Sequence, residues 1–512
     1  MASYLLGVDV GTTGTKTILI DGTKRVVASS TVEYPMETPQ PGWTQQDPED
    51  WWQAAMQSIQ AVLQKAAVPQ GEILGVGFSG QMHGMVALDR DGLVVRPAIL
   101  WNDQRTQAQC DEITQKAGGA EGLVKLTNNR MLTGYTGGKI LWMKQNEPEN
   151  YAKTVAVICP KDYVRYRLGG EIATDVSDAS GFGLFNVQRR AWSDEAIEIA
   201  GLRRSLFQKA YESYEVAGRV SAEAAALTGL LEGLPLTAGG GDAVIQTSGS
   251  GIVRQGVLGV VLGTSGVVAM GLEGFKPNPN GELQLFCSNE SGLWHGIGVT
   301  LAAGGSYRWF RDQLCGAQAK KAEEEGLDVY DLLSAEAEGA PAGCGGLVFL
   351  PYLSGERCPY PDPDARGVFF GLGLEHGHAH LNRAVMEGVT FSLRQVAERI
   401  YSTDASIKPE MVILSGGGAR SALWRQMTAD IFGLPVVTIE GSGEGGAFGG
   451  ALVAGVGLGL WKSLAEATGA PREATRNLPR PEAQAVYERA YALYSSLYGA
   501  LAPAFSAAAA LR

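Results

Sequence analysis

Residues 4–20, YLLGVDVGTTGTKTILI, decide the start of the fold: an apolar strand ends in a Gly/Thr turn, and a second apolar strand follows. A third stretch at 26–34, VVASSTVEY, comes after another turn, so the three stretches predict an antiparallel meander. Asp47 and Pro48 then supply a capping side chain and a proline at the first helical position, which predicts a helix to about Lys65. Strand-like and helical patterns alternate further along the chain, which indicates an α/β layer architecture.

The first strand and its turn have a second copy near the middle of the chain. LGVVLGTSGVV at 258–268 repeats LLGVDVGTTGTK at 5–16, and Gly263 matches Gly11 with an offset of 263 − 11 = 252. A chain of 512 residues is long enough for two or three domains, so the repeat predicts two related lobes. The boundary is expected near residue 250, which gives an N-terminal lobe at 1–250 and a C-terminal lobe at 251–512.

The composition excludes several classes of protein. A net charge of −12 would be repelled by a phosphate backbone or an anionic membrane surface, so neither nucleic acid nor membrane is expected as a partner. Hydrophobic residues at 45% and charged residues at 19% describe a chain that can bury a large core, which sets disorder aside. Glycine is abundant, 69 of 512 residues, which indicates many turns or places where backbone approaches a ligand.

Cysteine spacing and an uncharged, Gly-rich stretch bear on where the protein acts. The cysteines form no CxxC pair and the first residues show no basic leader, so a reducing cytoplasm is expected. The uncharged, Gly-rich stretch at 445–461 is shorter than the roughly 20 apolar residues that a membrane helix needs. Its GxxxG spacings predict a helix packed closely inside a protein core.

Two Gly/Thr turns follow the repeated strands, GTTGT at 11–15 and GTSG at 263–266. Glycine lets successive backbone N–H groups approach an anion, and Thr or Ser adds a hydroxyl donor, so each turn suits phosphate oxygens. Lys16 places a cation beside the first turn. An ordinary hairpin turn is the alternative for either copy alone. Two copies in matched lobes favour a shared polyphosphate, without the GxxxxGK[ST] loop of other nucleotide-binding proteins.

Two carboxylates stand out near these turns. Asp9 lies in the first apolar strand, where an unpaired charge is costly, so it is expected at the open end of the strand. The repeat has Val261 at the matching position, which indicates that the acid serves one lobe only. Asp242 follows three glycines after a predicted strand, and a helix cap is the alternative for it. Phosphoryl transfer needs Mg²⁺ on the phosphates and a base at the attacking hydroxyl. Of two separated carboxylates, one could bind the Mg²⁺ and the other could act as the base.

Two further stretches carry binding patterns in the second half of the chain. LSGGGARSALWRQMTADIFGLPV at 414–436 reads as strand, triple glycine and helix, where adenine and ribose could lie against backbone. A tight strand-to-helix turn is the alternative. His376, His378 and His380 alternate before a predicted helix, and a metal site is conceivable. A solvated loop is favoured, because no Cys and no acid other than Glu375 is spaced around the histidines.

A polar pocket is predicted from SGQMHGM at 79–85 and WNDQRT at 101–106. Glycines bracket His83, and the second stretch concentrates an aromatic ring, an amide, an acid and a cation. An aromatic ring against a sugar face, with polar groups on the hydroxyls, is suited to a small polyol. The alternative is buried packing of Trp101 beside a surface pair of Asp103 and Arg105.

These motifs together resemble the FGGY family of carbohydrate kinases over essentially the full chain. LGVDVGTTGTK, LGTSG and the stretch at 414–436 carry the resemblance, and SGQMHGMVALD with PAILWNDQRT resembles the branch that acts on ketopentoses. The resemblance implies two ribonuclease-H-like lobes of the actin and hexokinase type, of mixed α/β class, with a nucleotide cleft between them. It also implies ATP and Mg²⁺ as cofactors and a small-molecule sugar as substrate, and a homodimer is expected.

The resemblance further implies roles for individual residues. Asp242 matches the catalytic base, Asp9 matches an acid that helps to hold Mg-ATP, and both are expected to hold Mg²⁺, partly through water. The expected sugar contacts are Gln81, Met82, His83, Trp101, Asn102 and Asp103. The expected nucleotide contacts are Thr12, Thr13, Lys16, Gly263, Thr264, Ser265, Gly304, Gly417, Gly418 and Ala419.

The expected reaction is in-line transfer of the γ-phosphate of ATP to the terminal hydroxyl of D-xylulose, giving D-xylulose 5-phosphate and ADP. Ala243 and Val244 follow Asp242 where this branch commonly has an Asn-Ala pair, so ribulose, gluconate, glycerol or another polyol stays open as the substrate. The rival from another class is an actin-like scaffold or sensor that binds ATP without modifying a sugar. The polar stretches QMHG and WNDQRT argue against that rival.

Overall fold

The computed structural model describes residues 3–169, 171–278, 280–440, 445–470 and 472–511. The chain divides into two compact units. Unit 1 comprises Met1–Arg254, Leu272–His295 and Gly441–Pro471, and unit 2 comprises Gln255–Gly271, Gly296–Glu440 and Arg472–Arg512. A single division near residue 250 does not describe these units, because two later segments return to unit 1.

A central sheet organises unit 1. β1 (Tyr4–Val10) pairs antiparallel with β2 (Gly14–Asp21) and parallel with β5 (Ile73–Gly80). β3 (Val26–Glu33) pairs antiparallel with β2, so the predicted meander is confirmed. The sheet continues beyond β5 through β14 (Pro235–Thr237) to β13 (Val216–Arg219), and β15 (Gly240–Gly241) also pairs with β5.

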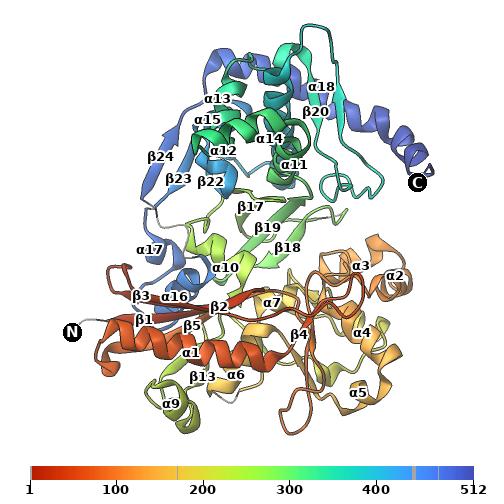
Figure 1. Ribbon diagram of the computed structural model, residues 1–512. Coiled ribbons are helices and arrows are strands. Elements are labelled where there is room, and N and C mark those ends of the chain that lie inside the picture. Colours follow the sequence, from red (N-terminus) through yellow and green to blue (C-terminus); the bar gives the residue numbers. More distant parts are fainter. Residues whose placement is uncertain (1–2, 170, 279, 441–444, 471, 512) are drawn as a thin grey trace. The chain divides into compact units, whose positions relative to one another are not determined.

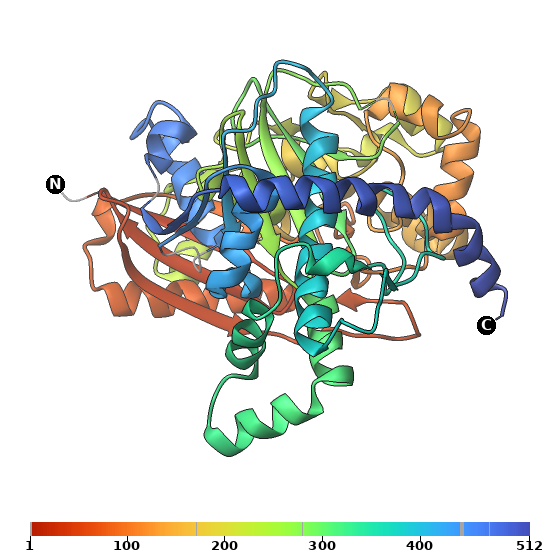
Figure 2. The same ribbon diagram turned by 90° about the horizontal axis from the view of Figure 1, so that it is seen from above.

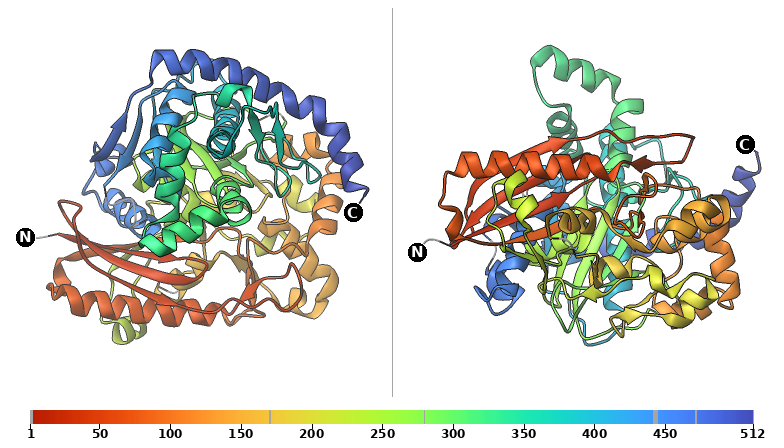
Figure 3. Two further views of the ribbon diagram at one scale, coloured as in Figure 1. Left: turned by 45° about the horizontal axis from the view of Figure 1, so that its top comes forward. Right: turned by 90° about the horizontal axis from the view of Figure 1, so that it is seen from below.

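α1 (Pro48–Ala66) packs on β2 and β3, along one face of this sheet (Figure 1; Figure 3). The Asp47 side chain accepts a hydrogen bond from the Glu49 backbone N–H at 2.9 Å, and Pro48 opens the helix, as the sequence predicts. Trp51 and Ile59 are among the side chains that the helix buries in the core of unit 1. Burial of these apolar side chains along one face of the helix holds the helix on the sheet.

α16 (Gly445–Gly457) packs on β1 and β5 with very little separation between the backbones. A Cβ atom on Gly7 would lie 1.9 Å from the Ala447 carbonyl oxygen, and one on Gly77 would lie 1.9 Å from that of Gly450. Real side chains cannot occupy such positions, so glycine is required on both strands. The close helix packing predicted from the GxxxG spacings is confirmed for the residues of this stretch that the structure describes.

The remaining elements of unit 1 are shorter and lie mostly between β3 and β13 along the chain. They include β4 (Gln45–Gln46), β6 (Val86–Leu88), β7 (Ala98–Ile99), α2 (Gln107–Lys116), α3 (Ala120–Thr127), α4 (Thr136–Asn146), α5 (Pro148–Lys153), β8 (Ala156–Ile158), α6 (Pro160–Gly169), β9 (Thr174–Asp175), α7 (Val176–Ser180), α8 (Asp194–Ile199), α9 (Ala222–Thr228) and α10 (Asp242–Gly249).

Unit 2 repeats the central pairing of unit 1. β16 (Val257–Leu262) pairs antiparallel with β17 (Gly266–Glu273) and parallel with β22 (Met411–Ser415), and β23 (Val436–Ile439) and β24 (Glu473–Asn477) extend the sheet. The long helix α18 (Pro481–Ala509) lies across α14 (His378–Tyr401) and contacts α15 (Ala422–Phe432) (Figure 2). Other elements are α11 (Gly304–Leu314), α12 (Gly316–Glu325), α13 (Val329–Glu338), β20 (Val348–Leu350) and β21 (Val368–Phe370).

Among the described residues, no helix combines the length and the apolar character that crossing a membrane requires. The mixed α/β class with two sheet-based units, predicted from the sequence, is confirmed.

Candidate active site

The two predicted acids lie at the same edge of the sheet in unit 1. Asp9 is the penultimate residue of β1 and lies in register with Ser79 of the parallel strand β5. Gly240 of β15 pairs with Ser79 from the other side. Asp242 follows that short strand and begins α10. Because these strands run parallel, their carboxyl ends meet at one edge, which is where ligands bind in open α/β sheets.

Asp242 titrates near neutrality. Burial is the main cause that raises its pKa to about 7, and the negative charge of Asp9 acts in the same direction. The backbone N–H groups of Ala243 and Met82 act in the opposite direction. The residue as a whole is nevertheless only partly buried. A carboxyl group with these properties is suited to accept a proton at physiological pH.

Asp9 is enclosed by the strand ends and by α16. Burial raises its pKa, while the Ser79 hydroxyl and the charge of Lys16, opposite Asp9 on β2, lower it. A Cβ atom on Gly446 would lie 2.8 Å from Asp9 Oδ1 and 2.2 Å from Ser79 Oγ, so the helix N-terminus closes over the acid. Asp9 Oδ1 is buried without a hydrogen-bond partner among the described residues.

The first Gly/Thr turn is braced by two of the predicted sugar residues. Gln81 Nε2 donates to the Gly11 carbonyl at 3.2 Å, and Thr12 Oγ1 lies 3.4 Å from Gln81 Oε1. Trp101 Nε1 donates to Thr12 Oγ1 at 3.0 Å, and the Trp101 side chain is 46% exposed. The predicted alternative of a buried Trp101 is therefore wrong. Thr13 is exposed at the tip of the turn.

Met82 and His83 lie in the turn that follows β5. Met82 is buried, and a Cβ atom on Gly241 would lie 2.5 Å from Met82 Cγ, so Met82 packs directly against the residue before Asp242. The His83 ring lies beside Tyr135, with ring centroids 4.9 Å apart. The structure thus brings both residues to the edge that carries the acids.

Asp103 is already fully engaged within unit 1. It is buried, accepts a hydrogen bond from the Thr44 backbone N–H at 2.6 Å, and forms an ion pair with Arg105 at 2.7 Å. The guanidinium of Arg105 lies 3.9 Å from the ring centroid of Trp43. The alternative interpretation expected Asp103 and Arg105 to form a pair at the surface; the pair is present, but it is buried. Neighbouring Asn102 accepts a hydrogen bond from Thr44 Oγ1 at 2.7 Å.

A buried charge cluster, which sequence analysis did not identify, supports the strand end before Asp242. Lys161 Nζ lies 2.6 Å from Asp162, 2.9 Å from Asp175 and 3.1 Å from Asp178. Cys159, Asp162 and Asp178 have the spacing of a metal site, but the Lys161 ammonium supplies the cation there. Ser177 Oγ donates to Asp175 and accepts a hydrogen bond from the Gly241 N–H at 3.0 Å. The cluster therefore anchors β15.

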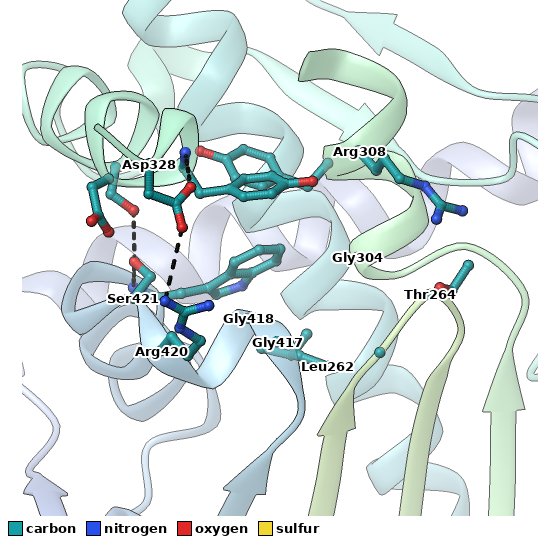
Figure 4. A pocket seen from close by; sticks show the side chains of 15 residues that line it. Leu262, Thr264, Gly304, Arg308, Asp328, Gly417, Gly418, Arg420 and Ser421 are labelled. Carbon is teal, nitrogen blue, oxygen red and sulfur yellow. Dashed lines mark hydrogen bonds and ion pairs between the residues drawn. The ribbon is translucent and has the colours of Figure 1, made fainter. Parts of the chain in front are cut away.

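A cavity of about 380 Å³ lies within unit 2, next to the second Gly/Thr turn (Figure 4). Five of the predicted nucleotide residues line it: Gly263, Thr264, Gly304, Gly417 and Gly418. Ser265 and Ala419 are not among the residues that line it. The remaining lining residues are Leu262, Tyr307, Arg308, Asp328, Tyr330, Asp331, Ser334, Arg420, Ser421 and Trp424.

Glycines shape this cavity in two different ways. The Gly304 N–H donates to the Gly263 carbonyl at 2.7 Å, which brings the N-terminus of α11 against the turn, and a Cβ atom on Gly304 would lie 2.6 Å from that oxygen. Gly416, with φ 87°, makes the sharp turn after β22. A Cβ atom on Gly417 would meet nothing within 4 Å, so this glycine leaves open space in the cavity.

Aromatic rings and an ion pair form the other walls. The Tyr307 ring stacks with Tyr330 at 5.8 Å and meets Trp424 edge-on at 5.2 Å. Figure 4 shows Arg420 facing Asp328, with an N···O distance of 3.8 Å. Sequence analysis identified none of these as site residues, although Arg420 and Trp424 lie in the quoted stretch at 414–436. Tyr307 and Tyr330 come from segments that carry no motif of their own, so no signal marked them.

The three alternating histidines make no metal site among the described residues. His376 Nδ1 accepts a hydrogen bond from the Gly373 N–H, and His380 Nδ1 accepts one from the Gly377 N–H. His378 Nδ1 lies 2.8 Å from Glu336 Oε2. The favoured prediction of a solvated loop is wrong: His378 and His380 lie in the first turn of α14, and the His376 side chain is buried.

Comparisons with known proteins agree with this geometry. The family models for the FGGY family of carbohydrate kinases match residues 4–249 with the N-terminal domain and residues 258–458 with the C-terminal domain. The xylulose kinase of Bacillus subtilis is 37% identical over 97% of this chain and 96% of its own length.

Two solved structures extend the likeness to the fold. The xylulose kinase from Rhodospirillum rubrum has a TM-score of 0.90 and 30% identity, with 98% of this chain and 100% of that chain covered. The gluconate kinase from Lactobacillus acidophilus has a TM-score of 0.90 and 28% identity, with 99% of both chains covered. The family expected from the motifs is confirmed: the chain belongs to the FGGY family of carbohydrate kinases.

Proposed function

We propose that this carbohydrate kinase phosphorylates D-xylulose with ATP, giving D-xylulose 5-phosphate and ADP. The observation that carries the proposal is Asp242, a carboxyl group whose pKa of about 7 suits a proton acceptor, at the sheet edge that also holds Met82 and His83. The relatives named xylulose kinase support D-xylulose as the sugar.

In the proposed reaction, ionised Asp242 accepts the proton of the terminal sugar hydroxyl. The hydroxyl oxygen forms a bond to the γ-phosphorus of ATP while the bond between that phosphorus and the β–γ bridging oxygen breaks, and ADP leaves. One proton passes to the carboxylate, and no phosphoenzyme forms. Asp9 lies opposite Lys16 of β2, and its negative charge is one cause that raises the pKa of Asp242.

Mg²⁺ is the metal that this chemistry implies, and Asp9 fits it. Mg²⁺ takes carboxylate oxygens and water as ligands, and Asp9 Oδ1 is a buried oxygen without a hydrogen-bond partner among the described residues. Asp9 and Asp242 would hold the ion, partly through water. When bound, the ion neutralises charge on the phosphates.

Sugar and nucleotide contacts follow the same proposal. The sugar contacts are Gln81, Met82, His83, Trp101, Asn102 and Asp103; because Asp103 is engaged with Arg105, its proposed role is to hold the loop in place. Thr12, Thr13 and Lys16 are proposed phosphate contacts in residues 1–250. The nucleotide contacts proposed in residues 251–512 are Gly263, Thr264, Ser265, Gly304, Gly417, Gly418 and Ala419, with the adenosine part in the cavity of unit 2.

The test is a coupled assay of ADP release with D-xylulose, D-ribulose, D-gluconate and glycerol as acceptors. The highest kcat/KM with D-xylulose is expected. A clear preference for another acceptor would overturn the proposed substrate while leaving the kinase class intact.

A gluconate kinase specificity is the second candidate, because the gluconate kinase structure is as similar in fold as the xylulose kinase structure. Preference for D-gluconate in the same assay would establish it. Release of ADP without any phosphorylated product would instead favour an actin-like ATP-binding scaffold.

A cytoplasmic location and a homodimer complete the proposal. None of the six cysteines, all of which lie in described parts of the chain, forms a disulfide, which supports a reducing compartment. Sedimentation analysis of the purified protein tests the homodimer, and a monomer at micromolar concentration would contradict it.

A further inference from the structure

The turn that carries His83 has an unusual backbone conformation. His83 has φ 68°, in the left-handed region that residues other than glycine rarely adopt. Its ring is enclosed by Tyr135 and by Phe286, with the second ring centroid 6.1 Å away. A Cβ atom on Gly181 would lie 2.2 Å from His83 Nδ1. Strained residues persist where the surrounding structure holds them and are common at functional sites.

Two side chains of α4 hold this turn through the His83 carbonyl. Lys139 Nζ donates to that oxygen at 2.7 Å, and Thr136 Oγ1 donates to it at 3.0 Å. Both side chains are fully buried. The left-handed conformation of His83 therefore has two dedicated hydrogen bonds that come from one helix.

The same lysine holds a second part of the proposed sugar site. Lys139 Nζ also donates to the Gly134 carbonyl at 2.7 Å. A Cβ atom on Gly134 would lie 2.9 Å from the Trp101 carbonyl oxygen, so Gly134 packs directly against the loop that carries Trp101 and Asn102. One ammonium group thus links the turn after β5 with the segment against which this loop rests.

Keeping a lysine at this position is unfavourable for stability alone. Burial lowers the pKa of Lys139 to about 7, and Asp103 acts most strongly in the opposite direction. A buried ammonium group is costly even when it is hydrogen-bonded, and an apolar side chain of similar length would avoid that cost. The lysine is therefore better explained by its two hydrogen bonds than by packing.

We propose that Lys139 is a positioning residue for sugar binding, which holds the His83 carbonyl and the Gly134 carbonyl so that the His83 imidazole meets the sugar. This inference rests on the proposed function, in which His83 contacts the acceptor. Lys139 touches neither the sugar nor ATP in this account, so it acts on sugar affinity and not on nucleotide affinity.

Lys139→Met tests the inference, with Lys144→Met as the matched control. Lys144 lies on the same helix and also donates to a carbonyl, that of Gly201, but it is exposed. Lys139→Met is expected to raise KM for D-xylulose by roughly ten- to a hundredfold, because a small misplacement of a contact is costly. KM for ATP should stay within about twofold in both variants, and KM for the sugar should be unchanged in the control.

A double-mutant cycle separates positioning from general destabilisation. His83→Asn keeps a residue that tolerates the left-handed region but removes the imidazole. If Lys139 acts through His83, Lys139→Met should add little to the KM of the His83→Asn variant. Additive effects, or an unchanged sugar KM in Lys139→Met alone, would overturn the inference.

Two further results keep the test decisive. Thr136→Val replaces Lys139→Met if the latter fails to fold, because it removes one hydrogen bond to the His83 carbonyl. It should raise the KM for the sugar and leave the KM for ATP unchanged. An unaltered KM for the sugar would count against the inference. Every variant is measured with the acceptor that the wild type prefers, so a preference for gluconate defeats only the proposed substrate. A wild type that phosphorylates no sugar defeats both proposals.

Discussion

The hairpin β1–β2 of unit 1 and the hairpin β16–β17 of unit 2 share one pairing scheme, but β1 carries a carboxylate where β16 carries an apolar side chain. Asp9 lies in register with Ser79 of β5, and Val261 lies in register with Ser415 of β22. After β5 the chain forms the turn of Met82 and His83, whereas after β22 it forms the glycine turn that lines the unit 2 cavity.

The comparison teaches how one scaffold supports two tasks. In both units the proposed site lies at the carboxyl ends of parallel strands, and the side chains and turns there differ. Unit 1 carries buried carboxylates, and unit 2 carries a cavity with glycine and aromatic walls. Acid–base chemistry should therefore depend on unit 1, and nucleotide affinity on the unit 2 cavity.

Asp242→Asn should have the largest effect. The amide cannot accept the proton, so turnover is expected to fall by about 10²- to 10⁴-fold. Nucleotide affinity, measured by isothermal titration calorimetry without Mg²⁺, should not change. Asp194→Asn, at an exposed acid of unit 1, is the control. Near-normal turnover in Asp242→Asn would refute its role as the base.

Asp9→Asn tests the position at which β1 carries a carboxylate and β16 carries a valine. Loss of this carboxylate should lower kcat/KM on the order of 10²-fold and raise the Mg²⁺ concentration needed for half-maximal activity. Val261→Ala, at the matching position of unit 2, should leave the Mg²⁺ dependence as it is. An unchanged Mg²⁺ requirement in Asp9→Asn would contradict the assignment.

Gly417→Val should weaken nucleotide binding without affecting the acid–base chemistry of unit 1. The new side chain would enter open space in the cavity without a clash in the protein, so the fold should persist. KM for ATP is expected to rise by at least about tenfold, while KM for the sugar stays the same. Gly499→Ala also adds a methyl group in open space, on α18, and serves as the control. A normal KM for ATP would show that nucleotide does not occupy this cavity.

The smallest expected effect is a shift in the pH dependence of kcat/KM between the wild type and Asp9→Asn. Asp242 must be ionised to accept a proton, so kcat/KM should rise with pH and level off above a pKa of about 7. The charge of Asp9 contributes to that raised value, so the residual activity of Asp9→Asn should rise at lower pH than that of the wild type. A profile that Asp9→Asn does not move would show that the two acids are not coupled.

Much of the framework could be predicted from the sequence because it depends on local pattern. The meander at 4–34, the capped helix after Asp47 and the repeat at 258–268 all follow from periodicity, turn residues and spacing. Gly417 and Gly418 were identified because a triple glycine between strand and helix is a local signal as well.

The rest depends on contacts between distant segments. Tyr307, Tyr330 and Trp424 meet only because α11, α13 and α15 pack together. Lys139 looks like an ordinary helix residue until its burial against the His83 carbonyl is seen. The return of the segment that carries α16 to unit 1 likewise has no local signal, since it arises from the packing of α16 on β1 and β5.

The most direct test of the central claim is the stoichiometry of the reaction. Wild-type protein with ATP, Mg²⁺ and D-xylulose is sampled over time, and ADP and sugar phosphate are quantified in the same samples. The account predicts equal amounts of ADP and D-xylulose 5-phosphate, and neither product above background in Asp242→Asn on the same timescale. Release of ADP without sugar phosphate, or equal product formation by Asp242→Asn, would contradict it.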